Sequence, residues 1–279
     1  MPPAVRAAAP LLGLIFVLRA VAAQAPREDQ VLILDKPAGT QSISRASDAT
    51  VRAEFSFNDR GRGDHIVASW KLDAQGVPLE YHGEGHDYHK AAVSETFSVH
   101  GGRASWHSRA EQGTREVSGA AFYVPANAPP EFLAVLARAL LKAPQQRLPL
   151  LPEGEATLQA VPAPAAASGA RLYEISGLDF APTPVWLTAD GATFAIVSDW
   201  FSTLTPPARA AFAGLRAAQD RATEAWSAQL AREQTRVPEG DVLIRHARLF
   251  DPRDLTVTAD TSVLVHGAYI VRVLEPIYK

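Results

Sequence analysis

The chain has 279 residues, of which 47% are hydrophobic and 20% are charged. This balance is typical of a folded globular protein, and the length suits about two domains. The formal net charge is −3, and no segment concentrates lysine and arginine, so the sequence gives no electrostatic support for nucleic-acid binding. The chain contains no cysteine, which excludes disulfides, thiolate nucleophiles and cysteine metal sites.

Residues 1–23 predict a secretory signal peptide. Arg6 supplies a positive charge, residues 11–18 are apolar, and small residues follow, so that cleavage is expected near Ala22 or Ala23. The apolar stretch is far shorter than the roughly 20 residues of a membrane-spanning helix. We therefore expect an exported protein, periplasmic or extracellular, without a membrane span.

Residues 29–204 predict a β-rich domain, because short runs of alternating apolar and polar side chains lie between turn formers. The runs at residues 51–57 and 65–72 each place their apolar side chains on one face of a strand. Gly101-Gly102 and Asp190-Gly191 stand between two such runs, where a two-residue turn closes a hairpin. We expect an antiparallel, curved sheet.

Two helices interrupt this pattern. Residues 129–144 open with two prolines, carry an apolar stripe at helical spacing and stop at Pro144. A longer connecting helix is expected over residues 205–236, with Thr205 as its N-cap. Residues 241–279 return to short alternating runs, which predict three further strands.

A histidine-rich stretch, "YHGEGHDYHK", is a candidate metal site. His82, His86 and His89 lie close together in the sequence with Glu84 and Asp87 among them, and imidazole and carboxylate groups are zinc ligands. On a strand, however, alternate side chains point to opposite faces, so these five side chains would not converge. A solvated strand is the competing interpretation. The sequence contains no G-x-S-x-G elbow, Walker loop or dinucleotide fingerprint.

The segment "VLIRHARLFDPRDLTVTADTSVLVHGAYIVRVLEP" resembles the N-terminal segment of the metal-dependent amidohydrolase superfamily. The matching residues are Val242, Leu243, Ile244, Ala247, Phe250, Asp251, Ser262, Val263, Leu264, Val265, Gly267, Ile270 and Val273. His246 and Ala268-Tyr269 depart from the family pattern. Residues 57–63, 87–97, 121–125, 136–141, 150–156 and 184–195 also look like the exported N-terminal extension of a bacterial subset of that family.

The resemblance implies an α+β, mainly antiparallel fold: a curved sheet domain with two helices, then the first strands of an amidohydrolase-type β-sandwich. It implies metal-assisted hydrolysis of carbon–nitrogen bonds by a full-length relative, with a divalent, zinc-type metal on a His-x-His pair. None of the eight histidines is two residues from another, so no catalytic, cofactor-binding or metal residue can be transferred. The chain is then a non-catalytic part, truncated before the catalytic barrel, and that missing barrel is its expected partner.

The alternative is a periplasmic binding or carrier module for an apolar ligand. A curved sheet over residues 29–204, with Trp70 and Trp106 on its inner face, could hold such a ligand against the helices. Export fits this interpretation equally well. The sequence predicts neither a substrate nor an oligomeric state.

Overall fold

The computed structural model describes residues 25–162 and 169–274. The chain divides after Ala222 into two units, and each is described by itself. Residues 1–23, interpreted above as a signal peptide, lie outside the described residues. None of the helices in the described part combines the length and the apolar character that a membrane crossing requires.

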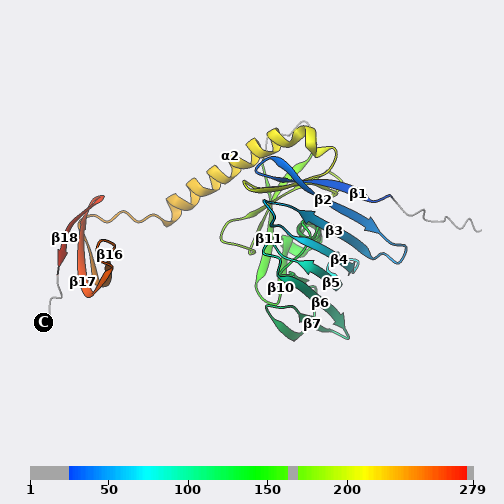
Figure 1. Cartoon of the computed structure of the whole chain (residues 1–279), viewed down its shortest axis with the longest axis horizontal. Coiled ribbons are helices and arrows are strands. Elements are labelled where there is room, and N and C mark those ends of the chain that lie inside the picture. Colours follow the sequence, from blue (N-terminus) through cyan, green and yellow to red (C-terminus); the bar gives the residue numbers. More distant parts are fainter. Residues whose placement is uncertain (1–24, 163–168, 275–279) are drawn as a thin grey trace, which may run out of the picture. The chain divides into compact units, whose positions relative to one another are not determined.

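The first unit is built on a 15-stranded sheet, counted over the described residues. Strands β1 to β8 follow one another in chain order, and Figure 1 shows β1 to β7 side by side. The sheet continues from β1 to β15 and then runs back through the sequence to β9. The pairs are antiparallel except for the parallel pair β9 and β10. The strands are β1 (Arg27–Ile33), β2 (Lys36–Arg45), β3 (Val51–Phe57), β4 (His65–Leu72), β5 (Pro78–His86), β6 (Ala92–His100), β7 (Arg103–His107), β8 (Gln112–Glu116), β9 (Phe122–Tyr123), β10 (Arg147–Leu151), β11 (Glu155–Val161), β12 (Arg171–Ser176), β13 (Thr183–Leu187), β14 (Thr193–Val197) and β15 (Phe201–Leu204).

Helix α1 (Glu131–Lys142) forms the centre of the main core. It begins directly after Pro130 and ends at Ala143, whose backbone is extended before Pro144. Eight of its residues are buried, and seven of them, all except Glu131, belong to one apolar cluster with side chains of β3 to β6 and β10 to β13. Because a helix buried on most of its circumference needs partners on opposite sides, α1 lies between the two halves of the curved sheet.

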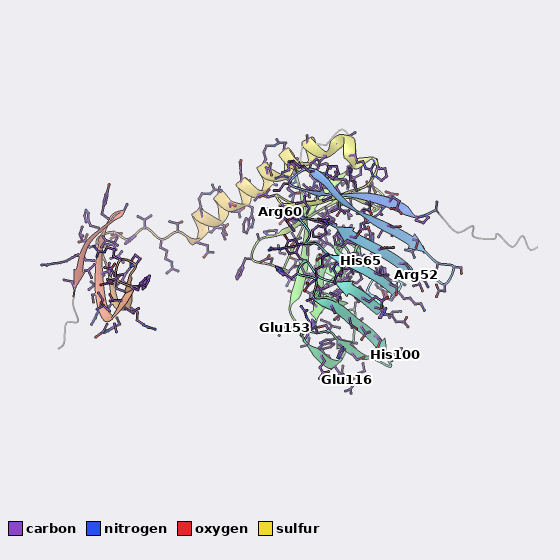
Figure 2. All side chains as sticks on the ribbon, in the orientation of Figure 1. Arg52, Arg60, His65, His100, Glu116 and Glu153 are labelled. Carbon is purple, nitrogen blue, oxygen red and sulfur yellow. The ribbon has the colours of Figure 1, made fainter. Side chains whose placement is uncertain are left out.

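Strands β3, β4 and β6 bury one face each, as the alternation of their side chains requires. In β3 the residues Val51, Ala53, Phe55 and Phe57 are buried, whereas Arg52 between them is exposed (Figure 2). Trp70, Trp186 and Phe194 are also buried. These aromatic side chains pack in the two apolar clusters of the first unit.

Helix α2 (Ala208–Gln234) uses its first turns to cover a second apolar cluster. Leu215 and Ala218 pack there with Trp186, and Gln219 accepts a hydrogen bond from Trp186 Nε1 (3.3 Å). The sequence predicted that Thr205 caps this helix. Instead, the Thr205 hydroxyl donates to the carbonyl oxygen of Phe194 (2.8 Å), so it ties the start of the helix to β14.

The second unit contains a three-stranded antiparallel sheet of β16 (Val242–Asp251), β17 (Thr256–His266) and β18 (Tyr269–Leu274). Gly267, with φ of 56°, lies in the turn where His266 pairs with Tyr269, as the sequence predicted. Many of its large apolar side chains are exposed, including Phe250 and Ile270. A mainly antiparallel α+β fold with two helices and a large curved sheet is confirmed, but the link to an amidohydrolase β-sandwich is not supported.

Candidate ligand-binding site

A cavity of about 600 Å³ opens in the first unit. Its walls come from β1 to β4, from α1 and from the turn between β13 and β14. The apolar part of the lining consists of Ile43, Val51, Trp70, Leu72 and Val135. The polar part includes Arg27, Ser44, Arg45, Glu131, Arg138, Asp190 and Thr193. The lining therefore combines an apolar set of side chains, here called the apolar wall, with a polar set, here called the polar wall.

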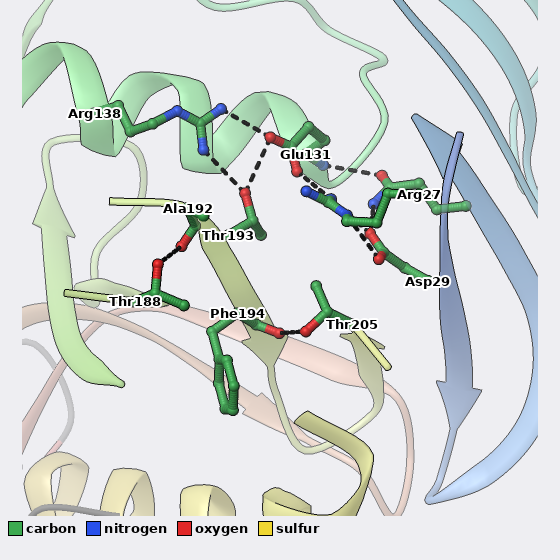
Figure 3. A network of polar contacts seen from close by, with 10 residues as sticks. Arg27, Asp29, Glu131, Arg138, Thr188, Ala192, Thr193, Phe194 and Thr205 are labelled. Atoms are coloured by element: carbon green, nitrogen blue, oxygen red, sulfur yellow. Dashed lines mark hydrogen bonds and ion pairs between the residues drawn. The ribbon is translucent and has the colours of Figure 1, made fainter. Parts of the chain in front are cut away.

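Glu131 is the centre of the polar wall, as Figure 3 shows. Its Oε2 accepts a hydrogen bond from Arg27 Nη2 (2.6 Å), and its Oε1 accepts one from Arg138 Nη2 (2.8 Å). The hydroxyl of Thr193 also donates to Oε1 (3.0 Å), while Arg138 Nη1 donates to that hydroxyl (2.9 Å). One buried carboxylate thus joins β1, α1 and β14.

Asp29 and Gln41 extend this network away from the cavity. Arg27 forms a bidentate pair with Asp29, with Nε to Oδ1 at 2.9 Å and Nη2 to Oδ2 at 2.7 Å. Gln41 donates to Asp29 Oδ2 (3.0 Å) and accepts from the backbone N–H of Glu131 (3.0 Å). Bidentate pairing fixes the plane of a guanidinium, so Arg27 is held in one orientation.

The network keeps Glu131 ionised although its side chain is buried. Burial alone would raise the pKa of this carboxyl, but the charges of Arg138 and Arg27 and their hydrogen bonds hold it below its ordinary value. Burial would likewise lower the pKa of Arg27, yet the hydrogen bond to Asp29 and the charge of Glu131 raise it. Both members of the pair are therefore charged near neutral pH.

The two arginines keep hydrogen-bond donors that the network does not use. Within the described residues, neither Arg27 Nη1 nor Arg138 Nε makes a hydrogen bond. The Arg27 side chain is 32% exposed and that of Arg138 is 30% exposed. Both side chains line the cavity, so the polar wall offers charged donors to whatever occupies it.

Trp70 belongs to the apolar part of the lining. It is 1% exposed, and its ring packs edge-on against Phe132 with centroids 5.3 Å apart. Its indole N–H is buried and has no hydrogen-bond partner among the described residues. A buried donor without a partner costs free energy, and because the nitrogen itself is buried, the cavity does not expose it to a ligand.

The histidine candidates do not gather into one site. His82 is exposed on β5, with its Nε2 3.8 Å from Glu84 Oε2. The ring of His86 lies beside that of His65, with centroids 5.8 Å apart, and His89 lies in the following turn with its ring edge-on to Tyr88. No group of three or more histidine and acidic side chains that could hold a metal ion occurs in the described ranges.

The sequence did not identify Arg27, Glu131 and Arg138 as site residues. One signal was present: Glu131 and Arg138 stand seven positions apart, which is about two helical turns, so they share a face of an otherwise apolar helix. Arg27 had no such signal, because its partner Glu131 is 104 residues away.

No family model matches this chain, and no curated protein matches it. Among solved structures, the chain is similar to one described as a beta-barrel-like protein of domain of unknown function DUF1849 from Brucella abortus. The identity is 13% and the TM-score is 0.37, over 66% of this chain and 97% of the other.

The comparisons contradict the interpretation of the chain as the N-terminal portion of an amidohydrolase. Neither an amidohydrolase family model nor a curated amidohydrolase matches it. The assignment to a hydrolase fragment with a missing catalytic barrel is therefore wrong. The physical reason lies in β16 to β18: alternating apolar residues around a glycine turn are what any antiparallel meander requires, so the short match was not specific.

Proposed function

We propose that this chain is a ligand-binding module whose cavity holds a small molecule with an apolar body. The observation that carries the proposal is the cavity of about 600 Å³ with an apolar wall and a few converging polar groups. Small-molecule sites in proteins have this combination and fall in the range of roughly 300 to 1,000 Å³. Transfer of an apolar body from water to the wall formed by Ile43, Val51 and Trp70 supplies the driving force.

The position of the cavity differs from the one that the sequence suggested. A ligand spread along the inner face of the sheet would compete with α1, which already occupies that face as part of the core. Trp106 packs at the margin of this core and is not part of the cavity lining, whereas Trp70 is. In this proposal the ligand binds beside α1, next to strand ends of β1 to β4 and the turn between β13 and β14.

Binding rather than acid–base catalysis is what Glu131 supports. A general base works best when its pKa is close to the operating pH. The pKa of Glu131 is held below its ordinary value by Arg138 and Arg27, and its oxygens already accept hydrogen bonds from three side chains. The carboxylate therefore holds Arg27 and Arg138 in place.

A neutral fluorescent probe, N-phenyl-1-naphthylamine, tests the proposal. We expect a saturable fluorescence increase with the wild-type protein and at least tenfold weaker binding to Ile43→Trp, because an indole at residue 43 fills the cavity. Val67→Trp is the matched control, since Val67 is an exposed β-branched residue of the same sheet outside the cavity lining. Absence of saturable binding to the wild type, or unchanged binding to Ile43→Trp, contradicts the proposal.

Export of the chain, expected from residues 1–23, is part of the same proposal. A binding module of this kind would meet its ligand outside the cytoplasm. Expression of the full chain followed by mass spectrometry of the product is the measurement. A mature N-terminus near Ala22 or Ala23 is the expected result, and an uncleaved, cell-retained chain contradicts export.

A further inference from the structure

We infer that the ligand of this cavity carries a single carboxylate at its polar end, as a fatty-acid-like monocarboxylate does. This inference rests on the proposed function, because it names the class of ligand for the same cavity. Arg27 and Arg138 bind the carboxylate, and the apolar body lies against Trp70.

The first argument is the imbalance between donors and acceptors on the polar wall. The oxygens of Glu131 accept hydrogen bonds from Arg27, Arg138 and Thr193, so this carboxylate is largely saturated. Arg27 Nη1 and Arg138 Nε have no hydrogen-bond partner in the described part of the chain. An acceptor group on the ligand satisfies these donors.

The second argument is preorganisation. Both guanidinium groups are held by buried carboxylates: Arg27 by Asp29 and Glu131, and Arg138 by Glu131. Planar guanidinium groups that are already fixed lose little rotamer freedom when they bind a second oxyanion. Hydrogen bonds between a guanidinium and a carboxylate are also about twice as strong as those between neutral groups, so a carboxylate is favoured over an alcohol.

The third argument is the overall charge of the wall, which favours one negative charge over two. The arginines are Arg27, Arg45 and Arg138, and the carboxylates that line the cavity or contact these arginines are Asp29, Glu131 and Asp190, so the formal sum is zero. A phosphate monoester brings a charge of about −1.5 to −2 at neutral pH, for which this wall has no matching excess of positive charge. A carboxylate brings a charge of −1, which is about one half to two thirds of that.

The apolar lining accommodates the hydrocarbon part of the ligand. Trp70, whose side chain is buried, is part of that lining together with Ile43 and Val51.

Displacement of N-phenyl-1-naphthylamine by four dodecyl compounds tests the inference. The compounds are dodecanoate, dodecanol, dodecyl phosphate and dodecyltrimethylammonium, each used below its micelle concentration. We expect dodecanoate to bind at least tenfold more tightly than the other three. If dodecanol binds as tightly as dodecanoate, or if the phosphate or the ammonium compound binds most tightly, the carboxylate assignment is overturned while the binding module stands. If neither the probe nor any dodecyl compound binds, the proposed function fails as well.

A variant that removes one positive and one negative charge tests whether the preference for dodecanoate comes from the polar wall. Removal of Arg138 alone would leave Glu131 with less compensation, so the variant is Glu131→Gln combined with Arg138→Gln, which removes one charge of each sign. We expect its dodecanoate affinity to fall to within about threefold of its dodecanol affinity, with dodecanol binding unchanged. Arg216→Gln is the control, because Arg216 pairs with Asp35 and Asp199 away from the cavity lining. A variant that keeps the tenfold preference overturns the assignment to Arg138 and Glu131.

Discussion

Replacement of Glu131 by glutamine tests whether the buried polar network stabilises the fold. Glutamine keeps the size of the side chain and one carbonyl oxygen, but it removes the negative charge that faces Arg27 and Arg138. The amide nitrogen that replaces one carboxylate oxygen is a donor, so it faces a donor of an arginine. We expect the variant to fold with a markedly lower free energy of unfolding.

The magnitude follows from the contacts. Removing one partner of a buried ion pair costs about 3 to 5 kcal/mol. Here the cost lies at the lower end, because Arg27 retains Asp29, Arg138 retains Thr193, and each arginine side chain is about one third exposed. We therefore expect a loss of about 3 kcal/mol.

Urea unfolding followed by circular dichroism measures this loss. With an m-value of roughly 1 to 3 kcal/mol/M, the midpoint should fall by about 1 to 3 M without a change in m. Glu153→Gln is the control, since Glu153 is exposed (Figure 2) and should change stability by less than about 0.5 kcal/mol. A loss for Glu131→Gln that is no larger than that of the control would refute the role of the network.

The same pair of proteins gives a pH dependence with a defined sign. The pKa of Glu131 is lowered in the folded state from an ordinary value of 4.5, so its stabilising contribution is complete above that pH. The contribution is lost as the pH falls through the folded-state pKa, because the folded protein must then take up a proton that it disfavours. The stability difference between wild type and Glu131→Gln should therefore be constant near neutral pH and narrow below about 4.5.

Two further pairs of variants test single features of the structure. Trp70→Phe should lower the free energy of unfolding by about 1 to 3 kcal/mol less than Trp186→Phe, as measured by urea unfolding. The reason is that the indole N–H of Trp186 has a partner, Gln219, which the change leaves unsatisfied, whereas that of Trp70 has none among the described residues. Equal losses would contradict the assignment of an unpartnered indole. Gly63→Ala should lower the stability by at least about 1 kcal/mol more than Gly61→Ala, as measured by thermal unfolding of the two variants. Both glycines have positive φ, but of the two only at Gly63 would a new methyl group lie 2.0 Å from a carbonyl oxygen.

The sequence predicted those elements whose signals are local. The alternation in β3 predicted its buried face because neighbouring side chains of a strand must point to opposite sides. Gly101 and Gly102 predicted the hairpin in which His100 pairs with Arg103, because both glycines adopt positive φ. Helix α1 was predicted because its apolar spacing, its preceding prolines and its terminating Pro144 agree.

The pairing of β1 with β15, which joins the two halves of the sheet, could not be predicted in this way. Gln30 lies opposite Leu204 in this pair, although the two residues are far apart in the sequence. Neither strand carries a local pattern that identifies its partner, since any alternating strand presents the same backbone donors and acceptors. The burial of α1 on most of its circumference depends on this pairing, and so does the cavity.

The residues of the candidate site could not be predicted from local sequence either. His82, His86 and His89 attracted attention because they are close in sequence. His82 and His86 lie four residues apart on β5, however, and His89 lies in the following turn, so the three side chains do not gather around one position. Arg27 and Glu131 are 104 residues apart and form a 2.6 Å ion pair. The closeness of the histidines in the sequence was therefore misleading. The contact between Arg27 and Glu131, by contrast, had no sign in the sequence.

The position of the network explains how one set of residues can serve both the fold and a ligand. Arg27 lies on β1 in one half of the sheet, Thr193 lies on β14 in the other, and Glu131 on α1 bonds to both. The carboxylate therefore ties the central helix to both halves of the sheet, and the same ion pairs fix the two arginines, which line the cavity and keep unused donors. A ligand that binds those donors is bound only by the folded protein, because the unfolded chain does not hold Arg27 and Arg138 together. Ligand binding and folding are then thermodynamically linked, and each stabilises the other by mass action.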